Sequence, residues 1–231
     1  GAGAQRLASR VQSHLEVIYG EKAGELVAPV IDAMRYAANI KEPVPYQNYW
    51  DESDCWMITY ATSVHNEGEP GLRTLQRFCD RYLADTINGL HILPFYPFSS
   101  DDGFAVIDYR TVDEAAGSWD DIRAIASRYR LMADLVINHV SSHSRWFQNY
   151  ISRKDPGKDY FKEAAPEDDL SLVVRPRSTP LRTEVETADG KRWVWCTFGP
   201  DQVDLDFSNP QVLLEFIEIV RFYLENGVRV L

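Results

Sequence analysis

Residues 118–140 read SWDDIRAIASRYRLMADLVINHV, and they contain a helix signal followed by a strand signal. Ser118 and Asp121 have the spacing of a capping box, in which each side chain accepts a hydrogen bond from the other residue's backbone N–H. Apolar side chains at helical spacing then face inward, namely Ile122, Ile125, Ala126 and Tyr129. The apolar run 131–140 has the length of a buried strand. This stretch therefore predicts a helix-then-strand unit of an α/β fold.

The same alternation continues in both directions along the chain. Short apolar runs at 55–60, 87–95 and 228–231 predict three further strands, and amphipathic patterns at 71–85 and 209–224 predict helices. Strands that alternate with helices form parallel sheets through right-handed crossovers. We therefore predict an α/β protein with one parallel sheet.

The arrangement favours the N-terminal half of a (β/α)8 TIM barrel. Residues 51–140 and 204–231 are assigned to this partial barrel, 141–203 to a small domain inserted after strand 3, and 1–50 to a helical N-terminal preface. A long irregular stretch inside an α/β unit is usually functional or a small domain, and a hairpin is expected in it at 189–190. The barrel part is less than half of the about 250 residues that a full barrel needs. We therefore expect a truncated chain.

Composition excludes several classes of protein. The chain of 231 residues has 24 Lys and Arg against 35 Asp and Glu, which gives a net charge of −11. Binding to nucleic acid or to anionic membranes needs a basic surface, so we predict neither partner. No apolar run approaches the about 18 residues of a membrane span, and the three scattered cysteines form neither a disulfide framework nor a metal site. We expect a cytoplasmic protein.

Three segments lie where parallel sheets carry their reactive groups, beyond strand ends or just before the last helix. These segments are 94–104, 134–140 and 202–207. Taken singly, each has an ordinary interpretation, because an acidic pair before glycine marks a turn, an Asn-His pair closes a strand, and alternating aspartates are solvated. Taken together, a carboxylate, an aromatic ring and an imidazole meet at one rim, from Asp101, Phe104 and His139. Such a set is typical of a sugar site.

Several motifs resemble the α-amylase superfamily, glycoside hydrolase family 13. Residues 134–139 (DLVINH) resemble its DxxxNH signature, and 202–206 (QVDLD) resemble its short motif near the end of the inserted domain. Residues 93–109 and 176–181 are most similar to the branch of sucrose and glucosylglycerate phosphorylases. The resemblance covers about residues 50–231.

The resemblance implies a role for each candidate residue. Asp101 binds hydroxyls of a glucose unit, Phe104 stacks on its ring, and His139 hydrogen-bonds the same glucose. Structural roles fall to the other motif residues, namely Asp134, Asn138, Asp204 and Asp206. The family's nucleophilic aspartate is expected just after Leu231 and its acid/base glutamate later still, so we expect no catalytic residue within this chain. The resemblance also implies no metal.

For the intact protein, the resemblance implies a glycosyltransferase reaction, the retaining phosphorolysis of an α-glucoside. A glucosyl-enzyme forms, and inorganic phosphate, the co-substrate, releases glucose 1-phosphate without a cofactor. Arg175 and Arg177 stand on a loop stiffened by prolines, and their planar guanidinium groups suit phosphate or carboxylate oxygens. We predict that one of them binds an anion, which favours glucosylglycerate over sucrose as the glucoside.

The sequence leaves alternatives open. One is an α-glucosidase or transglucosidase of the same superfamily, and another is a non-catalytic carbohydrate-binding barrel. The residues that follow Leu231 discriminate them, because only an enzyme needs an Arg-x-Asp motif and a later glutamate. Assembly into a homodimer is also open.

Overall fold

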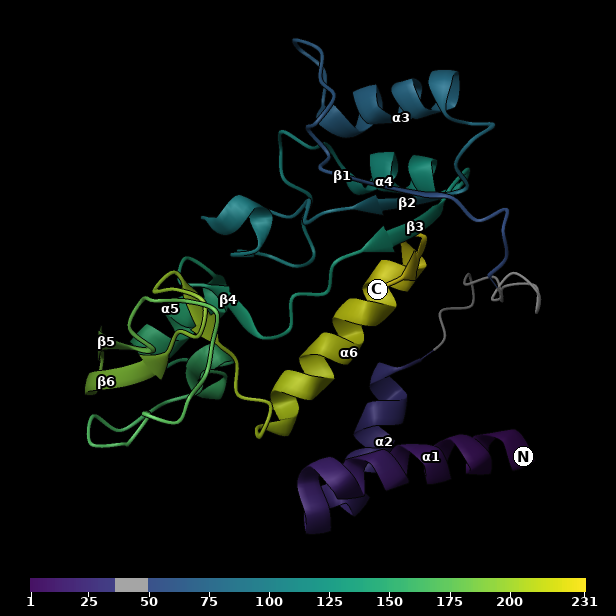
Figure 1. Cartoon of the computed structure of the whole chain (residues 1–231). Helices are drawn as coiled ribbons and strands as arrows, with labels where there is room; N and C mark the ends of the chain where they lie inside the picture. The colour runs from purple at the N-terminus through teal and green to yellow at the C-terminus, as the bar shows by residue number, and fades with distance from the viewer. Residues whose placement is uncertain (36–49) are drawn as a thin grey trace.

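The protein, as a computed structural model, is described at residues 1–35 and 50–231 (Figure 1). One sheet holds four parallel strands in the order β1-β2-β3-β8, which are Trp56–Thr59, Gly89–Ile92, Arg130–Ala133 and Val228–Val230. The helices that alternate with these strands along the chain are α3 (Gly71–Tyr82), α4 (Trp119–Ala126) and α6 (Pro210–Glu225). The predicted α/β fold with a parallel sheet is confirmed.

The two faces of the sheet differ in how they are covered. Leu90 and Leu131 pair in register, have no exposed surface and belong to the main hydrophobic core. Ile58, His91 and Met132 stand in register on the opposite face, where the Ile58 side chain is 62% exposed. Burial of apolar surface therefore holds the sheet mainly from one side.

Local signals set the helix ends as the sequence predicts. Ser118 accepts a hydrogen bond from the Asp121 N–H, and the Asp121 carboxylate accepts one from the Ser118 N–H at 2.9 Å, so the capping box is confirmed. Asn209 caps α6 through its side chain, with Pro210 as the first helical residue. Gly227 follows α6 with φ of 98°, a left-handed conformation that glycine adopts without steric cost.

The apolar run 131–140 does not form one strand, so that prediction is wrong. β3 ends at Ala133, and β4 (His139–Ser141) pairs antiparallel with β7 (Gln202–Asp204) in a separate two-stranded sheet. The predicted domain limits at 140 and 204 fall inside this strand pair. The division into domains stays a prediction.

Buried tyrosines explain why the strand breaks. The Tyr96 hydroxyl donates to the Asp134 carbonyl at 3.0 Å. The Tyr109 hydroxyl lies 2.7 Å from the Val136 carbonyl and 2.8 Å from the His139 carbonyl. These carbonyls face phenol groups instead of a neighbouring strand, so Tyr96 and Tyr109 supply hydrogen-bond donors where the backbone leaves the sheet between β3 and β4.

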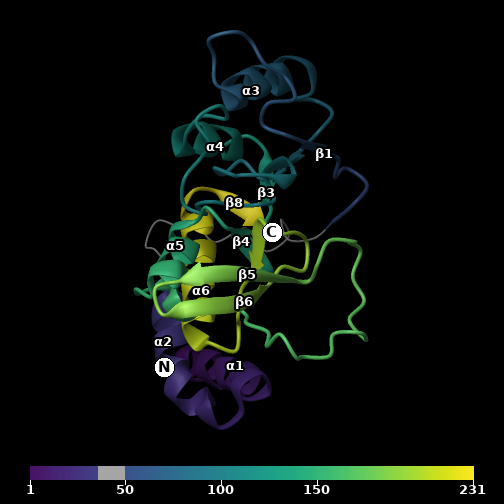
Figure 2. The ribbon, with the colours of Figure 1, turned by 90° about the vertical axis from the view of Figure 1, so that its left-hand side faces the viewer.

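The rest of the predicted insert contains a short helix and a hairpin. Helix α5 is Arg145–Ser152, and a 3-10 turn, η4, follows at Gly157–Asp159. Strands β5 (Arg182–Thr187) and β6 (Gly190–Trp195) pair antiparallel and lie side by side in Figure 2. The hairpin expected at 189–190 is confirmed.

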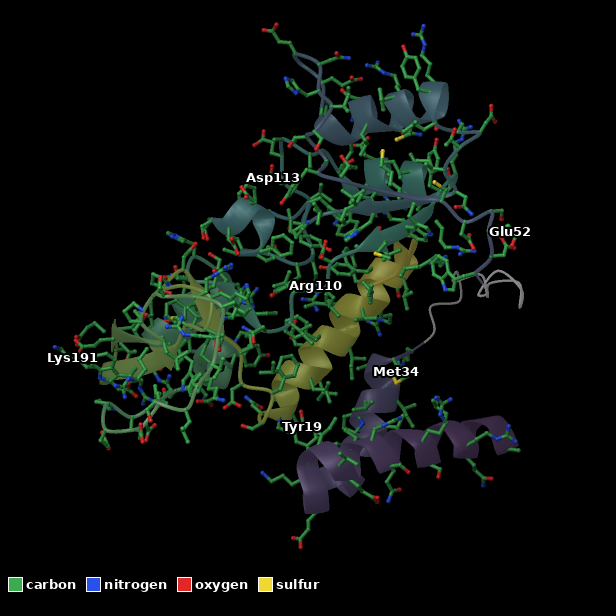
Figure 3. The ribbon with its side chains drawn as sticks, viewed as in Figure 1. Tyr19, Met34, Glu52, Arg110, Asp113 and Lys191 are labelled. Atoms are coloured by element: carbon green, nitrogen blue, oxygen red, sulfur yellow. The ribbon has the colours of Figure 1, made fainter. Side chains whose placement is uncertain are left out.

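The N-terminal helices pack against α6. Helix α1 (Ala2–Tyr19), the 3-10 turn η1 (Gly20–Lys22) and α2 (Ala23–Ala33) form this unit. Its apolar residues contact α6 through Leu213, Leu214 and Ile217. The Tyr19 hydroxyl donates to the Phe207 carbonyl at 2.7 Å, just before α6 begins (Figure 3). Residues 36–49 of the predicted N-terminal preface lie outside the described residues.

Candidate functional site

The loop after β2 meets the strand pair β4–β7 on the side of the molecule where β2 and β3 end (Figure 1). A bridge between Phe98 and Val106 closes this loop at its base, and the 3-10 turn η3 (Asp101–Gly103) lies inside it. The Ser141 N–H donates to the Val106 carbonyl at 2.8 Å, which ties the loop to β4. We call residues 98–106 the rim loop.

Asp101 stands in the rim loop and faces the insert. Its carboxylate accepts a hydrogen bond from the Gln202 side-chain amide at 2.8 Å, and a guanidinium nitrogen of Arg177 lies 4.0 Å from the same carboxylate. The Asp101 side chain is 40% exposed. One carboxylate oxygen is thus held by protein groups, while enough surface remains for a polar ligand.

His139 is a buried histidine in the same cluster, with only 5% of its surface exposed. Its Nε2 lies 2.9 Å from the Phe104 carbonyl, and its Nδ1 lies 3.2 Å from the Asn138 amide nitrogen. This pattern fits a neutral ring that donates from Nε2 and accepts at Nδ1. Burial lowers the pKa of His139 below its ordinary value, against opposing effects of the Phe104 carbonyl and of nearby aspartates.

Asp134, Asn138 and Asp204 make polar contacts in two places, one at the end of β3 and one beside His139. The Asp134 carboxylate lies 2.9 Å from the Nε2 of His91, whose side chain stands on the same face of the sheet as the exposed Ile58. The Asn138 amide donates to Asp204 at 3.3 Å, and Asp204 also accepts from the Thr197 N–H at 3.1 Å. Asp134 thus connects the end of β3 to β2, and Asn138 connects the segment before β4 to β7. The structural roles of these residues stay predictions.

Asp206 is not in this cluster. Its carboxylate accepts hydrogen bonds from the Ser208 N–H at 3.0 Å and hydroxyl at 2.6 Å, in the turn that leads into α6. The alternation of Asp204 and Asp206 along the chain therefore places one side chain in the buried network and the other at a helix entrance.

The two arginines proposed for anion binding point to different places. Arg175 donates to the Thr197 carbonyl at 2.9 Å, so its guanidinium braces the loop that carries it. Arg177 stacks over the Phe198 ring at 5.6 Å and faces Asp101. The structure thus brings Arg177 to the predicted sugar site and turns Arg175 toward the insert's own backbone.

The sequence pattern does not identify two residues of the cluster, Gln202 and Phe198. Gln202 bonds Asp101 and lies 3.2 Å from His139 Nε2, and the Phe198 ring lies 5.1 Å from the His139 ring. Gln202 begins the QVDLD motif at 202–206, so the motif could have indicated it as a site residue. No sequence pattern indicates Phe198, because it follows the hairpin in a stretch without periodicity.

A cavity of about 380 Å³ lies beside the rim loop. Residues after β1 and β2 line it, including Tyr60 and Pro94, together with Asp113, whose position Figure 3 marks.

Within residues 1–35 and 50–231, no group of three or more His, Cys, Asp or Glu residues could hold a metal ion. None of the helices described there is long and apolar enough to cross a membrane.

Comparison with known proteins defines the class. The sequence matches the family described as alpha amylase, catalytic domain, over residues 81–230. The chain therefore belongs to the alpha-amylase family, as its motifs predict, and its parallel sheet corresponds to part of the TIM barrel of these enzymes.

Individual relatives narrow the comparison. The chain is 44% identical over 222 residues to a glucosylglycerate phosphorylase of Allomeiothermus silvanus, with 96% of this chain and 39% of the relative covered. It is 35% identical over 172 residues to a sucrose phosphorylase of Streptococcus mutans, with 70% and 35% covered. The chain thus spans about 39% of the length of the first of these relatives.

A solved structure shows the same fold. The sucrose 6F-phosphate phosphorylase from Thermoanaerobacter thermosaccharolyticum superposes with a TM-score of 0.70 at 28% identity. The match covers 80% of this chain and 40% of that structure.

Proposed function

We propose that the protein containing this chain is a glycoside phosphorylase that cleaves an α-glucoside of glycerate. The similarity to glucosylglycerate phosphorylases carries the proposal, because three such relatives are 38–44% identical over 94–96% of this chain. Sucrose phosphorylase of Streptococcus mutans matches only 70% of the chain. Sucrose is therefore the second choice of substrate.

The reaction follows the retaining scheme of paired carboxyl groups about 5–5.5 Å apart. A carboxylate attacks the anomeric carbon as the bond to the glycerate oxygen breaks, and the acid/base group gives that oxygen its proton. Hydrogen phosphate then attacks the anomeric carbon, gives its proton to the acid/base group and releases the carboxylate, which yields glucose 1-phosphate. We expect the nucleophile and the acid/base group in sequence beyond Leu231, so this chain supplies part of the glucose subsite.

The rim loop supplies the groups that bind glucose. The exposed part of the Asp101 carboxylate accepts hydrogen bonds from sugar hydroxyls, and the Phe104 ring packs against the apolar face of the sugar. His139 contributes as a neutral donor whose present partner is the Phe104 carbonyl. A sugar hydroxyl reaches the His139 ring only if that contact opens.

Arg177 supplies the positive charge that an anionic substrate needs. Its side chain is 43% exposed, it lies beside Asp101, and the net charge of the chain is −11. A guanidinium group binds a carboxylate or a phosphate through two parallel hydrogen bonds. Arg175 supports the same loop through its hydrogen bond to the Thr197 carbonyl, so the proposal gives the anion to Arg177.

We also propose that the protein has no resident cofactor or metal, because the retaining scheme needs only the two carboxyl groups and inorganic phosphate as co-substrate. A cytoplasmic location and a homodimer stay predictions.

The test is an assay of the complete gene product that carries these residues. Glucose 1-phosphate release is measured with glucosylglycerate and with sucrose, each with and without phosphate. Phosphate-dependent release, faster from glucosylglycerate, is the expected result. Release of free glucose at the same rate without phosphate identifies a glucosidase and overturns the proposal.

Substitution of Arg177 tests the anion site. We expect Arg177→Ala to raise the KM for glucosylglycerate or phosphate by about tenfold to a hundredfold, which corresponds to a charge-assisted hydrogen bond of about 1.5–3 kcal/mol. Arg192→Ala is the matched control, because Arg192 is a paired arginine of the same insert that binds Asp189 and Glu163. Unchanged KM values for both substrates in Arg177→Ala contradict the assignment.

A further inference from the structure

Asp201 joins three segments at one carboxylate. Its Oδ2 accepts hydrogen bonds from the Ser99 and Ser100 hydroxyls of the rim loop, each at 2.5 Å. Its Oδ1 accepts one from the Ser142 hydroxyl at 2.5 Å, just after β4. The Asp201 backbone carbonyl accepts from the Ser142 N–H at 3.0 Å. A single side chain just before β7 therefore fixes both neighbouring segments.

The direction of these hydrogen bonds extends the network by one step. A carboxylate can only accept, so Ser99 donates its single proton to Asp201. The Ser141 hydroxyl, 2.5 Å from the Ser99 oxygen, must then donate to Ser99, and it accepts from the His143 N–H at 2.9 Å. The network is ordered from His143 through Ser141 and Ser99 to Asp201.

Charge supports the same arrangement. Burial works to raise the pKa of Asp201, but the three serine hydroxyls, together with nearby His143, outweigh it and hold the pKa below its usual range. The carboxylate is therefore ionised at neutral pH. An ionised acceptor makes these hydrogen bonds stronger than neutral ones.

The backbone next to the serines is strained. Asp101 and Asp102 have φ of 54° and 51°, and Gly103 follows with φ of 104°. Two consecutive non-glycine residues in the left-handed region are uncommon, even for aspartate, and such a turn depends on surrounding contacts to hold it. The serines bound by Asp201 come directly before this turn, and the Gln202 amide bonds Asp101 on the other side.

We propose that Asp201 is a positioning residue, which holds the strained turn so that the Asp101 carboxylate faces the sugar subsite. Its effect on catalysis rests on the proposed function, while its effect on the rim loop does not. Asp201 touches no substrate in this scheme. It acts through the serines and links the insert to the end of β2.

The first experiment measures hydrogen exchange of the rim loop in the complete gene product. We expect Asp201→Ala to speed exchange of amides in residues 98–106, and Asp201→Asn to restore most of the protection. The amide of asparagine can still bond the serines, because their hydroxyls can turn to accept. Asp189→Ala is the matched control, since Asp189 is also a carboxylate of the insert that binds a hydroxyl and an arginine.

The second experiment measures kcat/KM with the preferred glucoside. Displacement of a binding group by about 1 Å costs about a hundredfold, so we expect such a loss in Asp201→Ala, recovery in Asp201→Asn, and none in Asp189→Ala. Equal losses of thermal stability in the two alanine variants, with a loss of kcat/KM in only one, separate positioning from general destabilisation.

The outcomes distinguish the two proposals. Unchanged exchange of the rim loop in Asp201→Ala overturns the positioning role, whatever the activity. Faster exchange with unchanged kcat/KM also overturns it, because the turn then does not matter for binding. A complete gene product that cleaves no α-glucoside overturns the proposed function, and the exchange result still decides whether Asp201 holds the loop.

Discussion

Leu90 and Leu131 in the sheet have no exposed surface, whereas the Asp201 side chain, which joins the rim loop to the insert, is 27% exposed. The sheet is held by burial of apolar side chains, which is non-directional and tolerates small shifts. The rim is held by hydrogen bonds to single oxygen atoms, which depend on distance and angle. The first region should therefore govern stability, and the second should govern the geometry of the site.

The largest expected effect is on the sheet. Leu131→Ala removes a fully buried side chain, and we expect the free energy of unfolding to fall by about 2–5 kcal/mol. Denaturant unfolding of the complete gene product measures it. Leu172→Ala is the control, because Leu172 is 91% exposed. A loss below about 1 kcal/mol at Leu131 breaks the comparison, since the sheet would then tolerate a cavity.

The next effect is on the site. Asp101→Ala should lower kcat/KM by a factor that corresponds to about 1.5–3 kcal/mol, with the unfolding midpoint nearly unchanged. Asp102→Ala is a close control, because Asp102 shares the left-handed backbone but lines the cavity beside the rim loop, whereas Asp101 faces Gln202 and Arg177. If both variants lose activity equally, backbone strain and not the Asp101 carboxylate is responsible.

Tyr109 lies between the two regions, because it belongs to the core and also bonds the segment that leads to His139. Tyr109→Phe removes the donor that the buried His139 carbonyl and the partly buried Val136 carbonyl share, so we expect a loss of about 1–3 kcal/mol in unfolding free energy. Tyr82→Phe, at a position 60% exposed, is the control. Equal stability of the Tyr109 variant and the wild type would show that the segment is held by packing alone.

The smallest effect is a pH dependence. Burial lowers the pKa of His139, so the unfolded chain binds a proton at higher pH than the folded one. Stability should therefore decline as pH falls from about 6.5, the ordinary histidine pKa, through the lower folded value. His139→Gln should flatten this decline, and His14→Gln, at an exposed position, should not. An identical slope in His139→Gln excludes a neutral buried ring as its source.

The same division separates what the sequence predicts from what it misses. The capping box at Ser118 and the cap at Asn209 depend on neighbours within three residues, so the pattern alone reveals them. The break in the run 131–140 depends on Tyr96 and Tyr109, which bond it from far along the chain. An apolar run predicts a strand in either case, because the sequence pattern does not show whether its carbonyls face another strand or a phenol group.

The candidate site shows the same limit. The sequence predicts Asp101, Phe104 and His139 at one rim because parallel strands end together, and the structure links His139 to the Phe104 backbone and, through Gln202, to Asp101. The partner of each was not evident, since Gln202, Phe198 and Asp201 come from the insert. The acidic pair before Gly103 predicts the turn itself, but not the left-handed backbone of Asp101 and Asp102, because neither residue is glycine.

The packing of the N-terminal helices on α6 has a consequence for comparing genomes. Helix α6 buries Phe216 and Tyr223 in the main core and presents Leu213, Leu214 and Ile217 to α1 and α2. A homologue that begins after this helical pair would expose that apolar stripe to water. Such shorter homologues should therefore carry polar residues at the three aligned positions, and substitutions there should track the gain or loss of the helical pair across the evolutionary tree.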